Sequence, residues 1–268
     1  MRDAPSFTPR TSLGQNFLIN RDIVRRTVEK ADITENDVIL EIGPGQGVLT
    51  REILSSRCSH LHSIEIDRRL EPFLQDIEGD DRFSLHWGDG VKFPYGELRP
   101  VPSKVVANIP YHVTTPLIWS ILEKLAPSGL SYMIMMVQKE AADRLVAQAS
   151  TKERYPLGIT LAAMGSAKTY MKVSPGSFRP IPKVSSALVE LTIERRRDLP
   201  SDDLWRKVLK AGFSQRRKKL ANNLVSLGVK KEEILALMDR SDIPSEARAE
   251  TLSVSQWLEF VESLRRAV

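Results

Sequence analysis

The segment that most constrains the fold is residues 38–47, VILEIGPGQG, in which an apolar, strand-like run leads directly into three closely spaced glycines. A helix-like pattern follows at residues 49–55. Glycines at such a strand-to-helix turn let the backbone approach a ligand that a Cβ atom would hold away. The segment therefore predicts a ligand site at the end of a parallel strand, although an ordinary tight turn can show the same pattern.

Strand-like and helix-like segments alternate through the first two thirds of the chain. The further strand-like runs are residues 61–65, 83–86, 104–107, 132–137 and 185–193, and the further helix-like ones are residues 69–77, 116–125 and 141–148. This alternation predicts an α/β fold with a Rossmann-like, doubly wound and mostly parallel sheet.

After Pro200 the pattern changes to amphipathic helices, with apolar residues at three- and four-residue spacing. These helices are expected at residues 203–213, 216–227, 231–239 and 255–265. We therefore predict a boundary near residue 195, with a Rossmann-like domain at residues 1–195 and a small, all-helical domain at residues 196–268.

Composition limits the environment and the partners. The single cysteine, Cys58, cannot form an internal disulfide, and one cysteine with four histidines argues against a structural zinc site. The longest apolar stretches, such as residues 130–137, are too short to cross a bilayer, and the N-terminus shows no apolar h-region, so we expect no secretory signal. We expect a cytoplasmic protein with no membrane partner and no metal, and a monomer because nothing in the sequence argues for an oligomer.

Basic residues are concentrated between residues 195 and 219, where ten lysines and arginines stand against three acidic residues. A charge run alone is typical of a solvated helical face. Because this run begins a separate helical segment, a nucleic-acid surface and a solvated helical face are about equally favoured. The candidates for contact with nucleic acid are Arg216, Arg217, Lys218 and Lys219.

The glycine-rich loop indicates the class of its ligand. A dinucleotide site usually has the spacing G-x-G-x-x-G, because the pyrophosphate binds at the helix N-terminus. This chain instead has Gly43, Gly45 and Gly47 after an acidic residue, Glu41. An acidic strand end suits a cationic ligand that carries an amino acid, as S-adenosylmethionine does.

Acidic residues also follow the next two strand-like runs. Glu65 comes about twenty residues after the loop, where a carboxylate can accept hydrogen bonds from two ribose hydroxyls, with Asp67 as the alternative. Asp89, in a Gly-Asp-Gly turn, can accept a hydrogen bond from the cofactor adenine. Each acid by itself is also consistent with a surface position or a simple turn.

Residues 108–111, NIPY, end the fourth strand-like run and carry the predicted chemistry. An adenine N6 amine is a poor nucleophile because its lone pair is delocalised into the ring. Acceptors for its two hydrogens, the Asn108 side chain and the Ile109 carbonyl, favour the pyramidal geometry of the transition state. Pro110 fixes the turn, and Tyr111 offers a face on which the target base can stack. Such a tetrapeptide is often only a proline turn, but its place at a strand end favours catalysis.

Together these motifs resemble the KsgA/RsmA family of small-subunit (16S) ribosomal RNA adenine N6,N6-dimethyltransferases. The resemblance extends over outlying segments at residues 13–18 (LGQNFL), 136–140 (MVQKE), 178–186 (FRPIPKVSS), 213–219 (FSQRRKK) and 248–253 (RAETLS). It therefore covers nearly the whole chain.

The resemblance implies an enzyme that dimethylates two adjacent adenosines in the 3′-terminal hairpin loop of 16S rRNA, in the assembling small ribosomal subunit. It implies that residues 1–20 cover the cofactor, S-adenosylmethionine, and that Tyr111 and Phe178 hold the flipped base from its two faces. The implied cofactor-binding residues are Gln15, Asn16, Leu18, Gly43, Gly45, Gly47, Glu65, Ile66, Asp89 and Asn108.

Three other functions fit part of the pattern. A large-subunit rRNA adenine methyltransferase of the macrolide-resistance type has the same loop and a similar NIPY motif, but the outlying segments favour the small-subunit enzyme. DNA adenine methyltransferases typically have a doubled proline where this chain has Ile109 and Pro110. A non-catalytic ribosome-assembly or RNA-binding factor would use the basic surface but would need neither the cofactor loop nor Asn108.

Overall fold

The computed structural model describes residues 7–10 and 13–267, and the remainder of the predicted cofactor-covering segment, residues 1–6 and 11–12, lies outside the described residues. The chain divides into two units: one comprises residues up to 142 together with 168–192, and the other comprises residues 143–167 together with those from 193 onward. This division differs from the predicted boundary near residue 195 chiefly because residues 143–167 group with the C-terminal helices.

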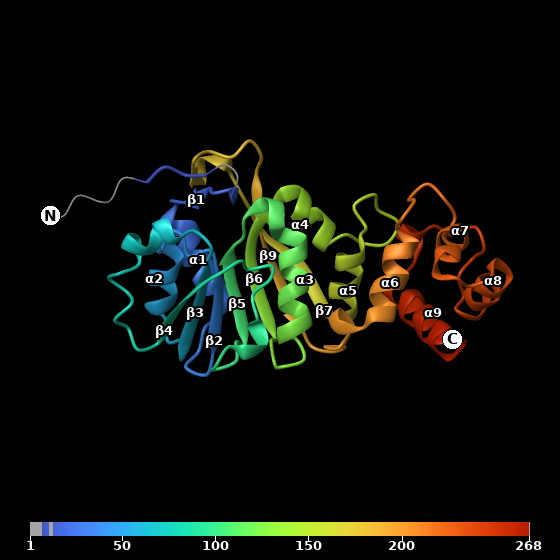
Figure 1. Ribbon diagram of the computed structural model, residues 1–268. Helices are drawn as coiled ribbons and strands as arrows, with labels where there is room; N and C mark the ends of the chain where they lie inside the picture. Colours follow the sequence, from blue (N-terminus) through green and yellow to red (C-terminus); the bar gives the residue numbers. More distant parts are fainter. Residues whose placement is uncertain (1–6, 11–12, 268) are drawn as a thin grey trace. The chain divides into compact units, whose positions relative to one another are not determined.

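Within the described residues, seven strands form the main sheet, in the order β4-β3-β2-β5-β6-β9-β7 (Figure 1). The strands are β2 (Val38–Ile42), β3 (His60–Glu65), β4 (Phe83–Trp87), β5 (Lys104–Asn108), β6 (Tyr132–Gln138), β7 (Gly165–Val173) and β9 (Ser186–Ile193). The five neighbouring strands β4, β3, β2, β5 and β6 are parallel to one another, and β9 runs antiparallel to β6. The predicted Rossmann-like sheet is therefore confirmed, and its strand order reverses between β2 and β5. Strand β7, at the edge of the sheet beyond β9, was not predicted, because its side chains, mostly exposed or half-buried, form no apolar run.

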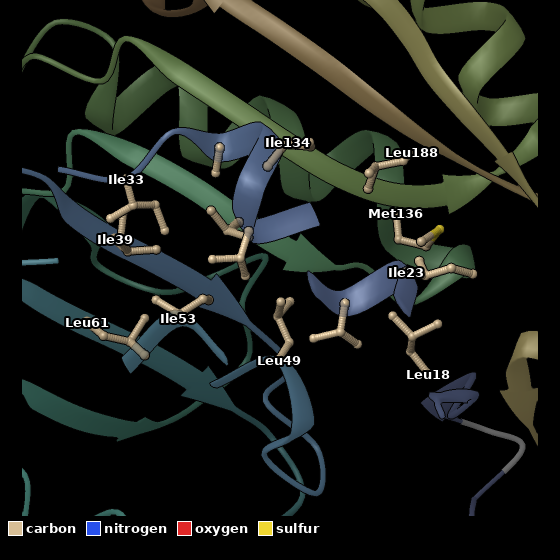
Figure 2. Packing of buried hydrophobic residues seen from close by; sticks show 14 of the residues in the cluster. Leu18, Ile23, Ile33, Ile39, Leu49, Ile53, Leu61, Ile134, Met136 and Leu188 are labelled. Carbon is tan, nitrogen blue, oxygen red and sulfur yellow. The ribbon is translucent and has the colours of Figure 1, made fainter. Parts of the chain in front are cut away.

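Two helices, α1 (Arg21–Ala31) and α2 (Val48–Leu54), pack with the sheet around the main hydrophobic core. Figure 2 shows Ile23 of α1 and Ile53 of α2 among side chains from the central strands, such as Ile39 and Ile134. Strand β2 is buried along its whole length, which explains why all its residues except Glu41 are apolar. This packing fixes β2, and with it the start of the glycine-rich loop.

The other helices of this unit are α3 (Thr114–Leu125) and α4 (Lys139–Leu145), whose last residues pass into the second unit. A two-stranded sheet pairs β1 (Phe17–Leu18) with β8 (Phe178–Arg179), so the N-terminal segment is tied to a chain segment far from it in sequence.

The second unit is helical and contains α5 (Pro156–Met164), α6 (Asp203–Gly212), α7 (Leu220–Leu224), α8 (Lys231–Arg240) and α9 (Val254–Ala267). Trp205, Trp257 and Phe260 are fully buried in it. The indole Nε1 of Trp205 donates a hydrogen bond to Thr160 Oγ1 at 2.9 Å, which links α6 to α5. Helix α5 was not predicted because it is apolar on nearly all sides and therefore shows no helical period.

Two of the predicted helices are wrong. Residues 69–77 were expected to be α-helical, but a 3₁₀-helix covers Arg68–Phe73, since Pro72 has no N–H to donate to an α-helical ladder. Residues 216–227 were expected to form one helix, but α7 begins only at Leu220. The preceding residues, 214–219, are all exposed and offer no apolar side chain to bury, so the basic run lies on a loop.

No helix in the described residues is both long enough and apolar enough to cross a membrane. The same residues contain no group of three or more His, Cys, Asp or Glu side chains that could hold a metal ion.

Candidate active site

A pocket lies at the carboxyl ends of β2, β3, β4 and β5, where the strand order reverses and where ligands bind in sheets of this kind. Of the predicted site residues, it is lined by Gln15, Asn16, Gly43, Gly45, Glu65, Ile66, Asp89, Asn108, Ile109, Pro110 and Tyr111. Leu18, Gly47 and Phe178 are not among its lining residues. Leu13, Gly14 and Phe17, from the predicted cofactor-covering segment, also line the pocket, and sequence reasoning missed the lining residues Gly90, His112 and Leu117.

The glycine-rich loop requires glycine because its backbone is left-handed at three positions. Gly43, Gly45 and Gly47 have φ angles of 70°, 59° and 77°, a region that L-residues with a side chain rarely adopt. Gly47 closes the turn by donating its N–H to the Pro44 carbonyl at 2.9 Å, and it starts helix α2. Gly47 therefore shapes the loop, whereas Gly43 and Gly45 face the ligand space.

Glu65 connects the tip of β3 to the loop. Its Oε2 accepts a hydrogen bond from the Gly45 N–H at 3.2 Å, and its Oε1 accepts from the N–H groups of Ile66 and Asp67, both at 2.8 Å. Burial raises the pKa of this carboxyl above its usual value. Carboxylate oxygens retain further lone pairs, so Glu65 can still accept hydrogen bonds from ligand hydroxyls in the pocket.

Asp67, the alternative to Glu65 as the carboxylate for the ribose hydroxyls, makes its hydrogen bonds to other residues of the protein. Its carboxylate accepts from Arg69 Nη2 at 2.5 Å and from Gln15 Nε2 at 2.8 Å, and these partners hold its pKa down at about 2. It is not a lining residue of the pocket. Asp89 does line the pocket, and its Oδ1 accepts from the Val91 N–H at 2.9 Å, which fixes the turn that presents the carboxylate.

The structure places Glu41 differently from the sequence-based interpretation. Its side chain does not reach the ligand space but lies buried behind the loop, where Oε2 accepts a hydrogen bond from Ser63 Oγ at 2.6 Å. Burial raises the pKa of Glu41 to about 7. Glu41 therefore supports the loop from within the core.

This shift makes stability depend on pH in a defined direction. The folded protein keeps a proton on Glu41 up to about pH 7, whereas the unfolded chain releases it near pH 4.5, so the Glu41 contribution to the free energy of unfolding falls as pH rises between these values. Glu41→Gln removes this titration. We expect the stability of the variant relative to the original protein to rise by about 2 to 3 kcal/mol between pH 5 and pH 8, measured by urea unfolding. Glu78→Gln, at an exposed position, should show no such trend; a flat difference for Glu41→Gln would contradict the burial argument.

The predicted catalytic motif lies beside the glycine-rich loop because β5 pairs directly with β2. Asn108 Nδ2 donates to the Asn16 carbonyl at 3.4 Å, while no group in the described parts of the chain donates a hydrogen bond to its Oδ1. The Ile109 N–H donates to the Met136 carbonyl at 3.1 Å, which fixes the backbone of the turn. Asn108 thus presents an unused acceptor to the pocket.

Tyr111 and Phe178 are not brought together as a pair facing the pocket. Tyr111 lines the pocket, and its hydroxyl is hydrogen-bonded to Ser186 Oγ at 2.5 Å, which anchors the ring. Phe178 is fully buried in the main core, on the strand that pairs with Leu18. In this conformation its ring has no free face for a base, so the structure does not show the expected sandwich.

A glycine-rich loop, a strand-end carboxylate and an uncommitted asparagine acceptor around one pocket define the site of a Rossmann-like methyltransferase. Comparison with known proteins agrees. The family model described as ribosomal RNA adenine dimethylase matches residues 6–266. Ribosomal RNA small subunit methyltransferase A of Clostridium botulinum (strain Kyoto / Type A2) is 38% identical over 251 residues, covering 92% of this chain and 90% of that protein. The Bacillus licheniformis protein of the same name is 37% identical, covering 98% and 93%.

Solved structures show the same fold. A dimethyladenosine transferase from Plasmodium falciparum has a TM-score of 0.80 at 26% identity, covering 94% of this chain and 98% of that one. The 23S rRNA methyltransferase ErmE has a TM-score of 0.69 at 24% identity, covering 93% and 100%. The chain therefore belongs to the ribosomal RNA adenine dimethylase family. It is an S-adenosylmethionine-dependent enzyme that dimethylates adenine in small-subunit ribosomal RNA.

Proposed function

We propose that the enzyme dimethylates the N6 amines of two adjacent adenosines in the 3′-terminal hairpin loop of 16S rRNA, while the small ribosomal subunit is being assembled. The observation that carries this proposal is the free acceptor of Asn108 beside the glycine-rich loop, in one pocket. A hairpin-loop base costs less to unstack than a base within a duplex, so it can reach a buried site. We further propose that the protein acts as a monomer in the cytoplasm.

The pocket residues suit S-adenosylmethionine, which supplies an electrophilic methyl group when bound. Gly43 and Gly45 leave room for its amino-acid part, since neither has a side chain. Glu65 is assigned to the ribose hydroxyls, and Asp89, with the neighbouring apolar Ile66, to the adenine. Gln15 and Asn16, from the N-terminal segment, complete the wall of the pocket.

Asn108 and Ile109 are assigned to the target amine. The Asn108 Oδ1 accepts a hydrogen bond from one N6 hydrogen and the Ile109 carbonyl accepts the other, so the nitrogen lone pair is released from the ring and directed at the methyl group. The methylated ammonium is acidic enough to lose a proton to water, so the site needs no separate general base. Pro110 holds the turn.

Base stacking is assigned to Tyr111, whose ring lines the pocket and is anchored through its hydroxyl. Phe178 can take the second face only if its ring leaves the core when RNA binds. Replacement of Phe178 would otherwise act through packing and the β1–β8 pairing.

We assign RNA docking to the C-terminal unit and, within it, to the exposed loop that carries Arg216, Arg217, Lys218 and Lys219. Arg216 donates a hydrogen bond to the Lys152 carbonyl, and Lys219 pairs with Glu246 at 2.5 Å. Arg217 and Lys218 have no carboxylate partner in the part of the chain that the structure describes. These two cations are therefore free to neutralise phosphates.

The double variant Arg217→Gln, Lys218→Gln is expected to bind small-subunit RNA about tenfold more weakly, with the slope of log affinity against log salt reduced by roughly one to two. The matched control is Lys230→Gln, Lys231→Gln, which removes the same charge from exposed positions at the start of α8. Filter binding over a range of salt concentrations gives both quantities. Equal slopes for the two double variants would refute the assignment of this loop.

The overall proposal is tested by transfer of labelled methyl groups from S-adenosylmethionine to purified ribosomal subunits, followed by mapping of dimethyladenosine. We expect label in small-subunit RNA at two adjacent adenosines. Label confined to large-subunit RNA would support the macrolide-resistance type of enzyme instead. Binding without label on any RNA would support a non-catalytic assembly factor.

A further inference from the structure

Contacts outside the pocket hold down one of its walls. Residues 13–17 form that wall, which is attached through the β1–β8 pairing, through the Asn16 carbonyl and through Gln15. The Gln15 Nε2 donates to Asp67 at 2.8 Å, and the Gln15 Oε1 accepts from the Arg10 N–H at 2.7 Å. Asp67 is nearly inaccessible, with 3% of its side chain exposed. One buried carboxylate therefore ties the N-terminal segment to the tip of β3.

Arg69 connects Asp67 to residues 7 and 8 of the N-terminal segment as well. It pairs with Asp67 through Nε at 2.9 Å and Nη2 at 2.5 Å, and its Nη1 donates to the Thr8 carbonyl at 3.2 Å. Its guanidinium also lies 4.9 Å from the ring centroid of Phe7. Phe7 in turn contacts Phe17 and Phe73 edge-on, at centroid distances of 5.5 and 5.9 Å. Residues 7–8 and Gln15 are thus linked through one Asp–Arg pair.

We propose that Asp67, Arg69 and Phe7 form a latch that holds residues 13–17 in place as a wall of the cofactor pocket and sets the rate at which the cofactor and its product leave. This inference rests on the proposed function, in that the ligand of the pocket is S-adenosylmethionine. Asp67 is a positioning residue in this arrangement, because it acts through Gln15 and Arg69.

The geometry favours a latch over direct ligand contact. Asp67, Arg69 and Phe7 do not line the pocket, and the carboxylate of Asp67 is already filled by charged and amide donors. Dimethylation of one amine consumes two cofactor molecules, so the pocket must open and close between the two transfers. Charge-assisted hydrogen bonds at a partly buried site are strong enough to slow that opening without preventing it.

The chain offers a matched control for removal of this pair. Asp80 and Arg82 have the same D-x-R arrangement: the Asp80 Oδ1 accepts from the Arg82 N–H and Nε at 2.9 and 3.1 Å, and Oδ2 accepts from Nη2 at 2.8 Å. That pair makes no hydrogen bond to residues 7–10 or 13–20, the part of the N-terminal segment that the structure describes; Arg82 also donates to the carbonyls of Leu54 and Ser56. Asp67→Asn and Asp80→Asn therefore remove the same local charge pair, and asparagine can still cap the backbone N–H groups.

The test measures dissociation of S-adenosylhomocysteine from the full-length protein by stopped-flow displacement. We expect Asp67→Asn to raise the dissociation rate about tenfold, with the association rate changed far less, and Asp80→Asn to leave both rates unchanged. KM for the cofactor should rise while kcat is maintained. Trypsin cleavage after Arg10 in the presence of S-adenosylhomocysteine should be faster in Asp67→Asn than in Asp80→Asn.

Phe7→Ala tests the other end of the latch, at a residue that makes no pocket contact. It should also speed dissociation of S-adenosylhomocysteine. In the double variant with Asp67→Asn, the increase should be smaller than the two single effects combined, since both substitutions release the same segment. Unchanged dissociation in both single variants would overturn the latch and leave the proposed function intact. Equally faster dissociation in Asp67→Asn and Asp80→Asn would also overturn the latch, because it would indicate a general loosening of the fold. Failure of the original protein to bind S-adenosylhomocysteine would refute the proposed function and the latch together.

Discussion

Asn108→Ala is expected to lower kcat for methyl transfer to small-subunit RNA by roughly 10²- to 10³-fold, the usual cost of removing one preorganised hydrogen-bonding group from a transition state. The Asn108 side chain is the only one assigned to the target amine, and its Oδ1 takes no hydrogen bond from the described residues. Without it, the amine remains conjugated with the ring and keeps little nucleophilic character. RNA affinity should stay within a few-fold of the original value, because the phosphate contacts are assigned to the C-terminal unit.

Cofactor affinity separates catalysis from binding in this experiment. Asn108 also donates to the Asn16 carbonyl in the pocket wall, so the alanine variant is measured by equilibrium binding of S-adenosylhomocysteine as well as by single-turnover transfer at saturating cofactor. Asn108→Asp keeps the acceptor and should retain more activity than alanine. Asn36→Ala, at an exposed loop position, is the matched control and should transfer normally. Near-normal turnover in Asn108→Ala would remove the residue from the mechanism.

The sequence predicts the central strands of the sheet and their ends well, because both depend on local patterns, but it does not reveal the edge strand β7. Strand β2 is buried on both faces and is apolar apart from Glu41, and the glycines after it adopt left-handed backbone angles. Glu65 and Asn108 follow from strand ends in the same way. Since parallel strands deliver their carboxyl ends to one edge, these local predictions converge on one pocket.

Features that depend on packing between distant segments are not predictable in this way. Helix α5 has no period because several elements surround it. Whether a strand-end acid faces the ligand depends on its neighbours. The Glu41 carboxyl accepts a hydrogen bond from Ser63, and the Asp67 carboxylate accepts hydrogen bonds from Gln15 and Arg69. Phe178 belongs to a motif of the family, yet pairing of its strand with Leu18 buries its ring in the core.

Gly45→Ala is expected to weaken cofactor binding by about tenfold or more, since a distortion of the binding loop that costs about 1.4 kcal/mol corresponds to a factor of ten in affinity. Two effects act together. A Cβ atom on Gly45 would lie 3.0 Å from Cδ1 and Cε1 of Phe17, so the wall of the pocket must move. The backbone at φ 59° is also strained for alanine, by about 1 to 2 kcal/mol. Equilibrium binding of S-adenosylhomocysteine measures the loss, and urea unfolding measures the strain.

Gly79→Ala is the matched control, because that glycine is not left-handed and an added Cβ would meet nothing within 4 Å. It should leave both binding and stability close to those of the original protein. The two effects at Gly45 can be separated by Phe17→Leu in the Gly45→Ala background. A smaller side chain relieves the contact but not the backbone strain, so cofactor affinity should recover in part while the free energy of unfolding stays low. If the double variant binds no better than Gly45→Ala, the contact with Phe17 is not what limits the loop, and backbone strain alone explains the need for glycine.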